Sequence, residues 1–224
     1  MTLHLFPDLE QGSDEWHAQR RGMVTASTVG QLVTPSTVKP ASNDVSRSLT
    51  ALLTAERITG YTEPTYLSDD MLRGVEDEPL AVDKYSEHFA PVTTIGFMIR
   101  DDWGFQIGYS PDGLVGEDGL IEVKSRRQKK HLQTIVSDQV PTEVTAQLQT
   151  ALLVSGRDWI DYVSYCGGMP LYRKRVTPDP KWFAAIIAAV EGFEKVSAEM
   201  TTTYRTAVEG LPMTNRSVIL EMVI

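Results

Sequence analysis

The sequence predicts an α/β protein of the mixed α+β kind, with one central mixed β-sheet flanked by helices. In four segments, apolar residues recur every three to four positions, which is typical of helices that pack on a core. Between the second and third of these segments the apolar period shortens to about two, which is typical of strands. Because helices and strands alternate along the chain, we expect them to share one core.

The size and composition of the chain fit one ordinary globular unit. It has 224 residues, of which 42% are hydrophobic and 23% charged, which is enough for one sizeable core. No linker rich in proline, serine or glycine and no repeat of about 20 to 50 residues divides the sequence. Residues 1–224 are therefore expected to form a single domain.

Four segments are predicted as helices: residues 46–59, 71–89, 141–155 and 179–206. Gly60 and Gly156 are placed to end the first and third helices, because glycine adopts the left-handed conformation that often follows a helix. Pro79 is expected to open or kink the second helix. Asp179 and Pro180 suit the cap and the first turn of the fourth.

Five segments are predicted as strands: residues 92–100, 105–116, 119–125, 159–166 and 170–177. Turn residues separate them, at Asp101-Asp102, at residues 117–119 and at Gly167-Gly168. If the second and third strands pair as a hairpin, residues near the end of the one lie beside residues near the end of the other.

The candidate chemistry lies on that hairpin. Glu122 and Lys124 are two apart on a predicted strand, so their side chains leave the same face, and the hairpin brings Asp112 beside Glu122. Carboxylates of this kind suit Mg²⁺ or Mn²⁺, and Lys124 would position or deprotonate a water and offset charge in the transition state. The structural alternative is a common Pro-Asp-Gly turn beside a solvated strand face with a weak ion pair.

Two further positions add to this group. Glu78 lies on the helix before the sheet, where it could complete a metal shell, although four acids within residues 76–83 also fit a solvated acidic face. Gln147 lies on the apolar stripe of the 141–155 helix, where its amide needs a partner. Gln149 lies off that stripe and is expected at the surface.

The charge balance limits how the protein could hold a polyanion. The 21 basic and 30 acidic residues give a net charge of −9, the wrong sign for binding nucleic acid by bulk electrostatics. Residues 124–131 contain five basic residues and no acid, which predicts a local strip that contacts phosphates. An ordinary basic loop is the alternative. The basic residues of this strip are Lys124, Arg126, Arg127, Lys129 and Lys130.

Several classes of protein are excluded by missing motifs. The single cysteine, Cys166, cannot form an internal disulfide, and with four histidines it cannot make a usual structural zinc site. The sequence contains no Walker loop, no Gly-x-Ser-x-Gly motif, no run of about eighteen apolar residues and no standard secretion signal. We therefore expect a cytoplasmic protein with no membrane contact and no ATP-driven motor.

These positions together resemble the PD-(D/E)xK nuclease superfamily, and within it the phage-type recombination exonucleases that are similar to lambda exonuclease. Residues 10–27 sharpen the resemblance, because they contain Gln-Gly, Trp, Arg, Gly and Thr-Ala-Ser in the order of that family's opening signature. The similarity runs in patches from about residue 10 to residue 166. It implies a restriction-endonuclease-like core.

The resemblance also implies an activity and partners. It implies an exonuclease that uses Mg²⁺, with Mn²⁺ as a substitute, to digest linear double-stranded DNA from its 5′ ends in phage or prophage recombination. A toroidal homotrimer and a single-strand annealing recombinase are implied as well. The implied residue roles are metal binding by Asp112, Glu122 and the Val123 carbonyl, a further acid at Glu78, catalysis by Lys124, support by Gln147, and 5′-phosphate binding by Arg20 and Ser27.

Several alternatives to this interpretation remain open. Arg20 could instead pair with an acid such as Asp14. The chain could be another nuclease of the superfamily, of the repair, CRISPR-adaptation or endonuclease type, or a non-catalytic module that binds DNA ends. It also departs from the lambda enzyme, since Ser125-Arg126-Arg127 replaces an apolar turn that contains proline. The apolar tail at residues 218–224 has no counterpart and is interpreted as an edge strand, a partner contact or a disordered end.

Overall fold

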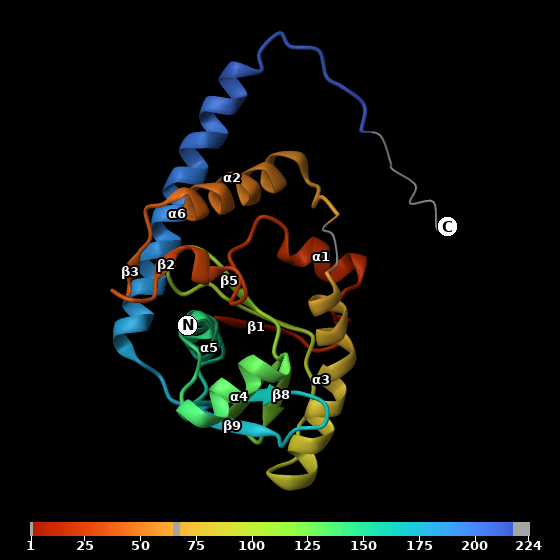
Figure 1. Ribbon diagram of the computed structural model, residues 1–224. Coiled ribbons are helices and arrows are strands. Elements are labelled where there is room, and N and C mark those ends of the chain that lie inside the picture. Colours follow the sequence, from red (N-terminus) through yellow and green to blue (C-terminus); the bar gives the residue numbers. More distant parts are fainter. Residues whose placement is uncertain (1, 65–67, 217–224) are drawn as a thin grey trace.

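The structure is a computed structural model that describes residues 2–64 and 68–216 (Figure 1). Its helices are α1 (Asp14–Arg20), η1 (Val29–Gln31, a 3₁₀ turn), α2 (Asp44–Thr59), α3 (Asp69–His88), α4 (Gln128–Ser137), α5 (Thr142–Ser155) and α6 (Pro180–Ala207). Its strands are β1 (Leu3–Phe6), β2 (Val33–Thr34), β3 (Lys39–Pro40), β4 (Phe97–Arg100), β5 (Ile107–Tyr109), β6 (Gly113–Val115), β7 (Gly119–Ser125), β8 (Trp159–Tyr165) and β9 (Tyr172–Val176). The predicted mixture of helices and strands is confirmed. The apolar tail at residues 218–224 lies outside the described residues.

The β structure is divided among three sheets, where one central sheet was expected. Their strand orders are β1-β4-β5, β2-β3 and β6-β7-β8-β9. In the last of these, β7 and β8 are parallel and the other neighbours are antiparallel, so this sheet is mixed as predicted. The strand expected over residues 105–116 is interrupted at Ser110-Pro111-Asp112, because Pro111 has no N–H to donate to a neighbouring strand. Its two parts, β5 and β6, therefore belong to different sheets.

The four predicted helices are present, with shifted ends. Gly60 and Gly156 follow α2 and α5 in the left-handed conformation, with φ of 62° and 71°. The side chain of Asp179 accepts a hydrogen bond from the backbone of Lys181 and caps α6. Pro79 lies inside α3 and does not open it, because Ser68 caps the helix eleven residues earlier. The sequence analysis did not predict the short strands β1, β2 and β3 or the helix α4.

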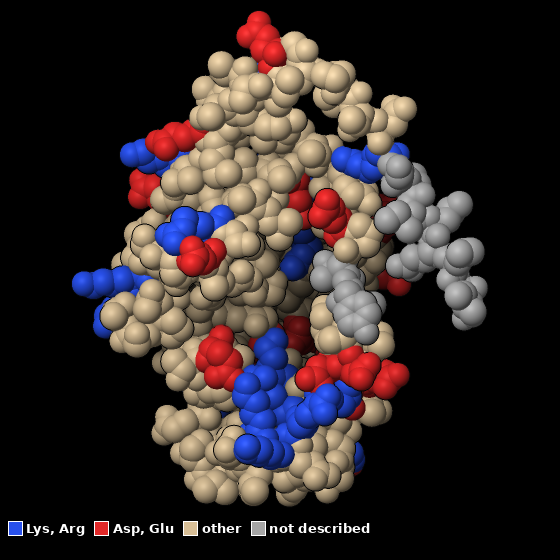
Figure 2. Space-filling model, turned by 45° about the horizontal axis from the view of Figure 1, so that its top comes forward, with Lys and Arg blue, Asp and Glu red and all other residues tan. Residues whose placement is uncertain are grey.

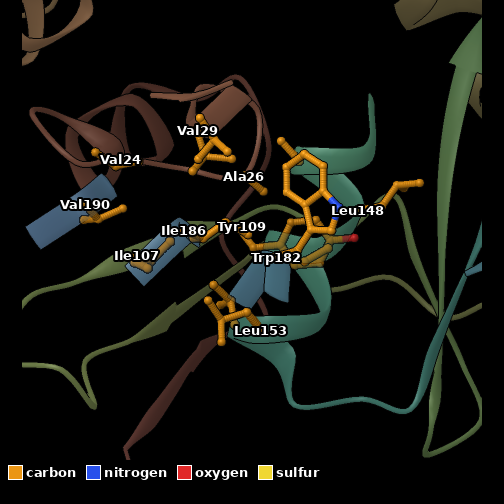
Figure 3. Packing of buried hydrophobic residues seen from close by; sticks show 14 of the residues in the cluster. Val24, Ala26, Val29, Ile107, Tyr109, Leu148, Leu153, Trp182, Ile186 and Val190 are labelled. Carbon is orange, nitrogen blue, oxygen red and sulfur yellow. The ribbon is translucent and has the colours of Figure 1, made fainter. Parts of the chain in front are cut away.

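The main core lies between the helices α5 and α6 and the strands of two sheets. Figure 3 shows Val24 and Val29 from the segment before α2, Ile107 from β5, Leu148 from α5 and Ile186 from α6 packed together. Each such side chain contributes roughly 1.5–3 kcal/mol when it is fully buried. A second cluster joins α3 to the four-stranded sheet through Ala81, Tyr85, Val115, Ile121, Val123 and Val163.

The position of Gln149 differs from the prediction. It is 2% exposed, its side-chain N–H donates to the carbonyl of Thr177, and its side-chain oxygen accepts from the backbone of Asp179. The expectation of a surface residue is wrong because α5 is enclosed on nearly all sides, so its second face is buried as well.

Over the described residues, no helix has the length and apolar content needed to cross a bilayer.

Candidate active site

The hairpin of β6 and β7 brings the predicted acids together. Gly113 of β6 pairs with Ile121 of β7 in antiparallel register, so Asp112 lies beside Glu122 and Val123. A carboxyl oxygen of Asp112 accepts a hydrogen bond of 2.7 Å from the backbone N–H of Val123. The hairpin that the sequence analysis expected is therefore confirmed.

Glu122 is the centre of the group. It is 1% exposed, and its Oε1 accepts hydrogen bonds from Lys124 Nζ, at 2.6 Å, and from the side-chain N–H of Gln147. Glu122 is thus the partner that the amide of Gln147 needs. The other carboxyl oxygen, Oε2, is buried and makes no hydrogen bond to any described residue. A buried carboxylate oxygen without a donor is costly, so this oxygen is available to a cation.

The charges of the group perturb one another. Burial, and then the charge of Glu122, raise the pKa of Asp112 well above its ordinary value. Burial and the charge of Glu122 also raise the pKa of Glu78. Burial acts to lower the pKa of Lys124, but the charges of Glu122 and Asp112 outweigh it and the pKa is raised. Three carboxyl groups thus share one poorly solvated region with a single ammonium, an arrangement that a divalent cation would stabilise.

The donor chemistry of the site fits a hard divalent cation. Within residues 2–64 and 68–216, no three His, Cys, Asp or Glu side chains are arranged so that they could hold a metal ion as they stand. Mg²⁺ does not need such a cage, because it keeps several waters and binds through one or two carboxylates. Asp112 and Glu122, with the unpartnered Oε2 of Glu122, supply oxygen donors of that kind.

Arg20, at the end of α1, lies among hydroxyl groups. Its two terminal nitrogens donate to Ser110 Oγ at 3.0 Å, Ser27 Oγ at 3.1 Å and Thr25 Oγ1 at 3.4 Å. Its guanidinium carbon lies 4.0 Å from the ring centroid of Trp16, and the Trp16 indole N–H also donates to Ser110. The predicted neighbours Arg20 and Ser27 are thus in contact.

The Arg20 cluster has the properties of an anion site. Burial lowers the pKa of Arg20 to about 10, so the guanidinium is still charged at neutral pH. Among the residues that the structure describes, no carboxylate lies within 4.0 Å of it, so the alternative ion pair with Asp14 is absent. A partly buried cation whose hydrogen-bond partners are all hydroxyl groups is suited to accept a phosphate. Because Ser110 is two residues before Asp112, the cluster adjoins the acids.

The sequence analysis assigned no role in the site to Trp16, Thr25 or Ser110. Trp16 precedes Arg20 by four residues, which places both on one face of a helix, and Thr25 belongs to the Thr-Ala-Ser motif that contains Ser27. Ser110 stands directly before Pro111-Asp112, so its place in the motif was the available signal.

The predicted basic strip runs from Lys124 at the end of β7 through the turn before α4 to the first turn of that helix. Figure 2 shows Lys and Arg side chains gathered below a hollow in this face, with acidic side chains on either side. Arg127 pairs with Asp70 at 2.7 Å, and Lys130 pairs with Glu143 at 2.5 Å. Nε and Nη2 of Arg126 are buried without a hydrogen bond to any described residue, and Lys129 is exposed. The strip is thus partly neutralised by neighbouring acids.

Comparison with known proteins gives consistent matches. Residues 15–158 match the YqaJ-like viral recombinase domain. A crystal structure of an alkaline exonuclease from Laribacter hongkongensis is 33% identical, covers 88% of this chain and 99% of its own, and superposes with a TM-score of 0.78. A phage related exonuclease from Haemophilus somnus 129PT, 14% identical over 81% of this chain and 96% of its own, has the same fold with a TM-score of 0.62. No significant match was found among curated proteins.

Proposed function

This chain belongs to the YqaJ-like viral recombinase family, and on that premise we propose that it is a Mg²⁺-dependent 5′→3′ exonuclease. It acts on the ends of linear double-stranded DNA in the cytoplasm of a phage-infected or prophage-bearing cell, and it serves homologous recombination. Its relative from Laribacter hongkongensis is an alkaline exonuclease that has also been crystallised with dAMP, which supports a deoxynucleoside monophosphate product. The observation that supports the proposal most strongly is the convergence of Asp112, Glu122 and Lys124 around a buried, unpartnered carboxylate oxygen.

Each residue of the site has a role in this proposal. Asp112, Glu122 and the carbonyl of Val123 hold Mg²⁺, or Mn²⁺ as a substitute, and Glu78 supplies a further acid. A bound ion would polarise the phosphodiester and activate a water for attack near neutral pH. Lys124 orients the attacking water and offsets the charge of the transition state. The amide of Gln147 donates to Oε1 of Glu122, so that Oε2 would be the oxygen that binds the ion.

A second set of residues selects and holds the DNA. Arg20 and Ser27 bind the terminal 5′-phosphate, with Ser110 and Thr25 as further hydroxyl donors. Behind this terminus, the duplex backbone contacts the basic strip. Contacts to phosphates do not depend on the base sequence, so the strip can hold any duplex without reading its bases. The strip residues that contact the backbone are Arg126, Arg127, Lys129 and Lys130.

The proposal includes an assembly. We expect a homotrimer that surrounds DNA and works with a single-strand annealing recombinase, as the resemblance to lambda-type exonucleases implies. An exposed apolar stripe near the C-terminal end of α6 supports self-association. It consists of Val196, Met200 and Tyr204.

A digestion experiment tests the activity. Linear double-stranded DNA with 5′-phosphates is incubated with the protein with and without Mg²⁺, beside covalently closed circular DNA. We expect mononucleotides only from linear DNA and only with Mg²⁺. A folded Glu122→Gln variant should lose the activity, and wild-type digestion by that variant would refute the site. Cleavage of closed circles would instead indicate an endonuclease of the same superfamily.

A further inference from the structure

The first half of α3 is attached to the molecule by polar contacts. In this helix only Ala81 and Tyr85 are buried, and both lie in the second half. Apolar side chains of the first half face solvent, with Met71 47% exposed and Val75 71% exposed. Hydrophobic burial therefore does not fix this half, and its position depends on the hydrogen bonds and ion pairs that it makes.

Those contacts converge on the end of β7. The hydroxyl of Ser125 accepts a hydrogen bond of 3.0 Å from Arg73 Nε and donates one of 2.6 Å to Asp77 Oδ2. Asp70 pairs with Arg73 at 2.8 Å, and it accepts from Arg127 Nη2 at 2.7 Å. We call these five residues the Ser125 network. Its central atom is the Ser125 hydroxyl, which is both donor and acceptor between two residues of α3.

The network joins the direct neighbours of two site residues. Ser125 follows Lys124 in the chain, and Glu78 follows Asp77. Because side chains alternate along a strand, Ser125 leaves β7 on the face of Ile121 and Val123, which packs against α3, while Glu122 and Lys124 leave the opposite face. The hydrogen bond between Ser125 and Asp77 thus ties the residue after Lys124 on β7 to the residue before Glu78 on α3.

Glu78 lies at the boundary between the two halves of α3, next to Asp77 and three residues before the buried Ala81. The contact of Asp77 with Ser125 therefore restrains the backbone of Glu78 on the side that hydrophobic burial does not reach.

We propose that the Ser125 hydroxyl is a positioning group that fixes the first half of α3 on the end of β7 and so keeps the Glu78 carboxyl at the cation site. This inference rests on the proposed function, because it gives Glu78 a task in cation binding.

The test compares Ser125→Ala with Ser125→Thr, which keeps the hydroxyl, and with Glu87→Gln. Glu87 pairs with Lys84 at 2.6 Å on the exposed side of the same helix, so its loss is a matched control. For Ser125→Ala we expect faster amide hydrogen exchange over residues 69–78 and Mn²⁺ affinity lowered about 10- to 100-fold, as for other residues that orient ligands. The kcat should fall while KM for DNA changes little. Ser125→Thr should recover most of each loss, and Glu87→Gln should match the parent.

Two results would overturn the proposal: unchanged exchange over residues 69–78 in folded Ser125→Ala, or unchanged Mn²⁺ affinity in calorimetry. If Ser125→Ala does not fold, Asp77→Asn removes the same contact from the helix side and takes its place. A parent protein without nuclease activity would refute the proposed function alone, since exchange and Mn²⁺ calorimetry report on α3 without DNA.

Discussion

At the scale of single residues, the site depends on how the two oxygens of one carboxylate are used. Lys124 and Gln147 both donate to Oε1 of Glu122, and Oε2 is left without a donor among the described residues. A structural ion pair would gain from satisfying both oxygens, because an unpaired buried acceptor costs about 1–3 kcal/mol. An incompletely satisfied buried acid between Asp112 and Lys124 is therefore better explained by a role in cation binding than by folding stability.

Arg20 gives the first prediction. For Arg20→Lys and Arg20→Ala we expect the preference for 5′-phosphorylated over 5′-hydroxyl ends to fall by about 10- to 100-fold, since each charge-assisted hydrogen bond contributes about 1.5–3 kcal/mol. Lysine should fail almost as much as alanine, because an ammonium cannot donate to Ser27 and Ser110 with one planar fork. Competition between the two kinds of DNA end measures this ratio. Equal rates on both ends in the parent protein would show that Arg20 does not bind the terminal phosphate.

At the scale of helices and strands, local patterns predicted the parts of the site that lie close in sequence. The period-two alternation placed Glu122 and Lys124 on one face, and the short turn after residue 116 placed Asp112 beside them. The same reasoning failed for residues 105–116, because it counted apolar alternation across Pro111 and so joined two strands of different sheets. Strand pairing of that kind is set by contacts distant in sequence, which a local period does not contain.

The features that were missed all involve contacts between segments that are distant in the sequence. The helix α4 was not predicted because the basic residues before and within it obscured its amphipathic pattern. In this helix His131 is fully buried and contacts Ser164 and the carbonyl of Pro170. Gln149 was misassigned because one apolar stripe predicts one buried face, whereas α5 is enclosed on nearly all sides. The hydroxyls of Thr25 and Ser110 meet Arg20 only because β5 lies beside the segment before η1.

Asp161 of β8 gives a prediction about how the elements are joined. It is fully buried and accepts hydrogen bonds from Tyr85 of α3 at 2.6 Å, from Arg173 at 3.1 Å and from Arg175 at 2.9 Å. Removing this charge weakens the hydrogen bonds from two partly exposed arginines, so Asp161→Asn should lower the free energy of unfolding by about 1.5–3 kcal/mol at pH 7. Asp44→Asn, which removes an exposed ion pair with Arg47, should change it by less than about 0.5 kcal/mol. Urea unfolding measures both.

The pH dependence of that loss follows from the pKa of Asp161. Burial acts to raise this pKa, but the hydrogen bonds from Arg175 and Tyr85 outweigh it, so the pKa lies below its ordinary value. A carboxyl whose pKa is depressed by folding contributes fully above its unfolded pKa of about 3.9 and loses that contribution as the pH falls through its folded pKa. The difference between parent and Asp161→Asn should therefore shrink below about pH 4. A constant difference between pH 7 and pH 3 would contradict this assignment.

At the scale of the whole molecule, an acidic protein must bind a polyanion through a local surface. The net charge is −9, and four of the five cations of the basic strip are already paired: Lys124 with Glu122, Arg127 with Asp70, and both Arg126 and Lys130 with Glu143. Lys129 is exposed and has no ion pair among the described residues, so we expect it to contact phosphate directly. Lys129→Gln should weaken DNA binding equally across sequences and reduce the slope of log K against log salt by about 1. Titrations at several salt concentrations measure the slope, with Lys39→Gln on β3 as the control.

The end of α6 gives the last prediction, which concerns assembly. Figure 1 shows the last turns of α6 extending past α2. Val196, Met200 and Tyr204, four residues apart, are 44%, 37% and 42% exposed there, and the first two line a cavity of about 560 Å³ between α6 and α2. If neighbouring copies cover this stripe, a charge at its centre must be desolvated in the interface, which costs several kcal/mol. Met200→Asp should therefore shift the mass measured by light scattering toward that of the monomer, whereas Leu5→Asp, at an exposed site on β1, should leave the oligomer intact. An unchanged mass in folded Met200→Asp would exclude this face from the interface, and a monomeric parent protein would refute the oligomer itself.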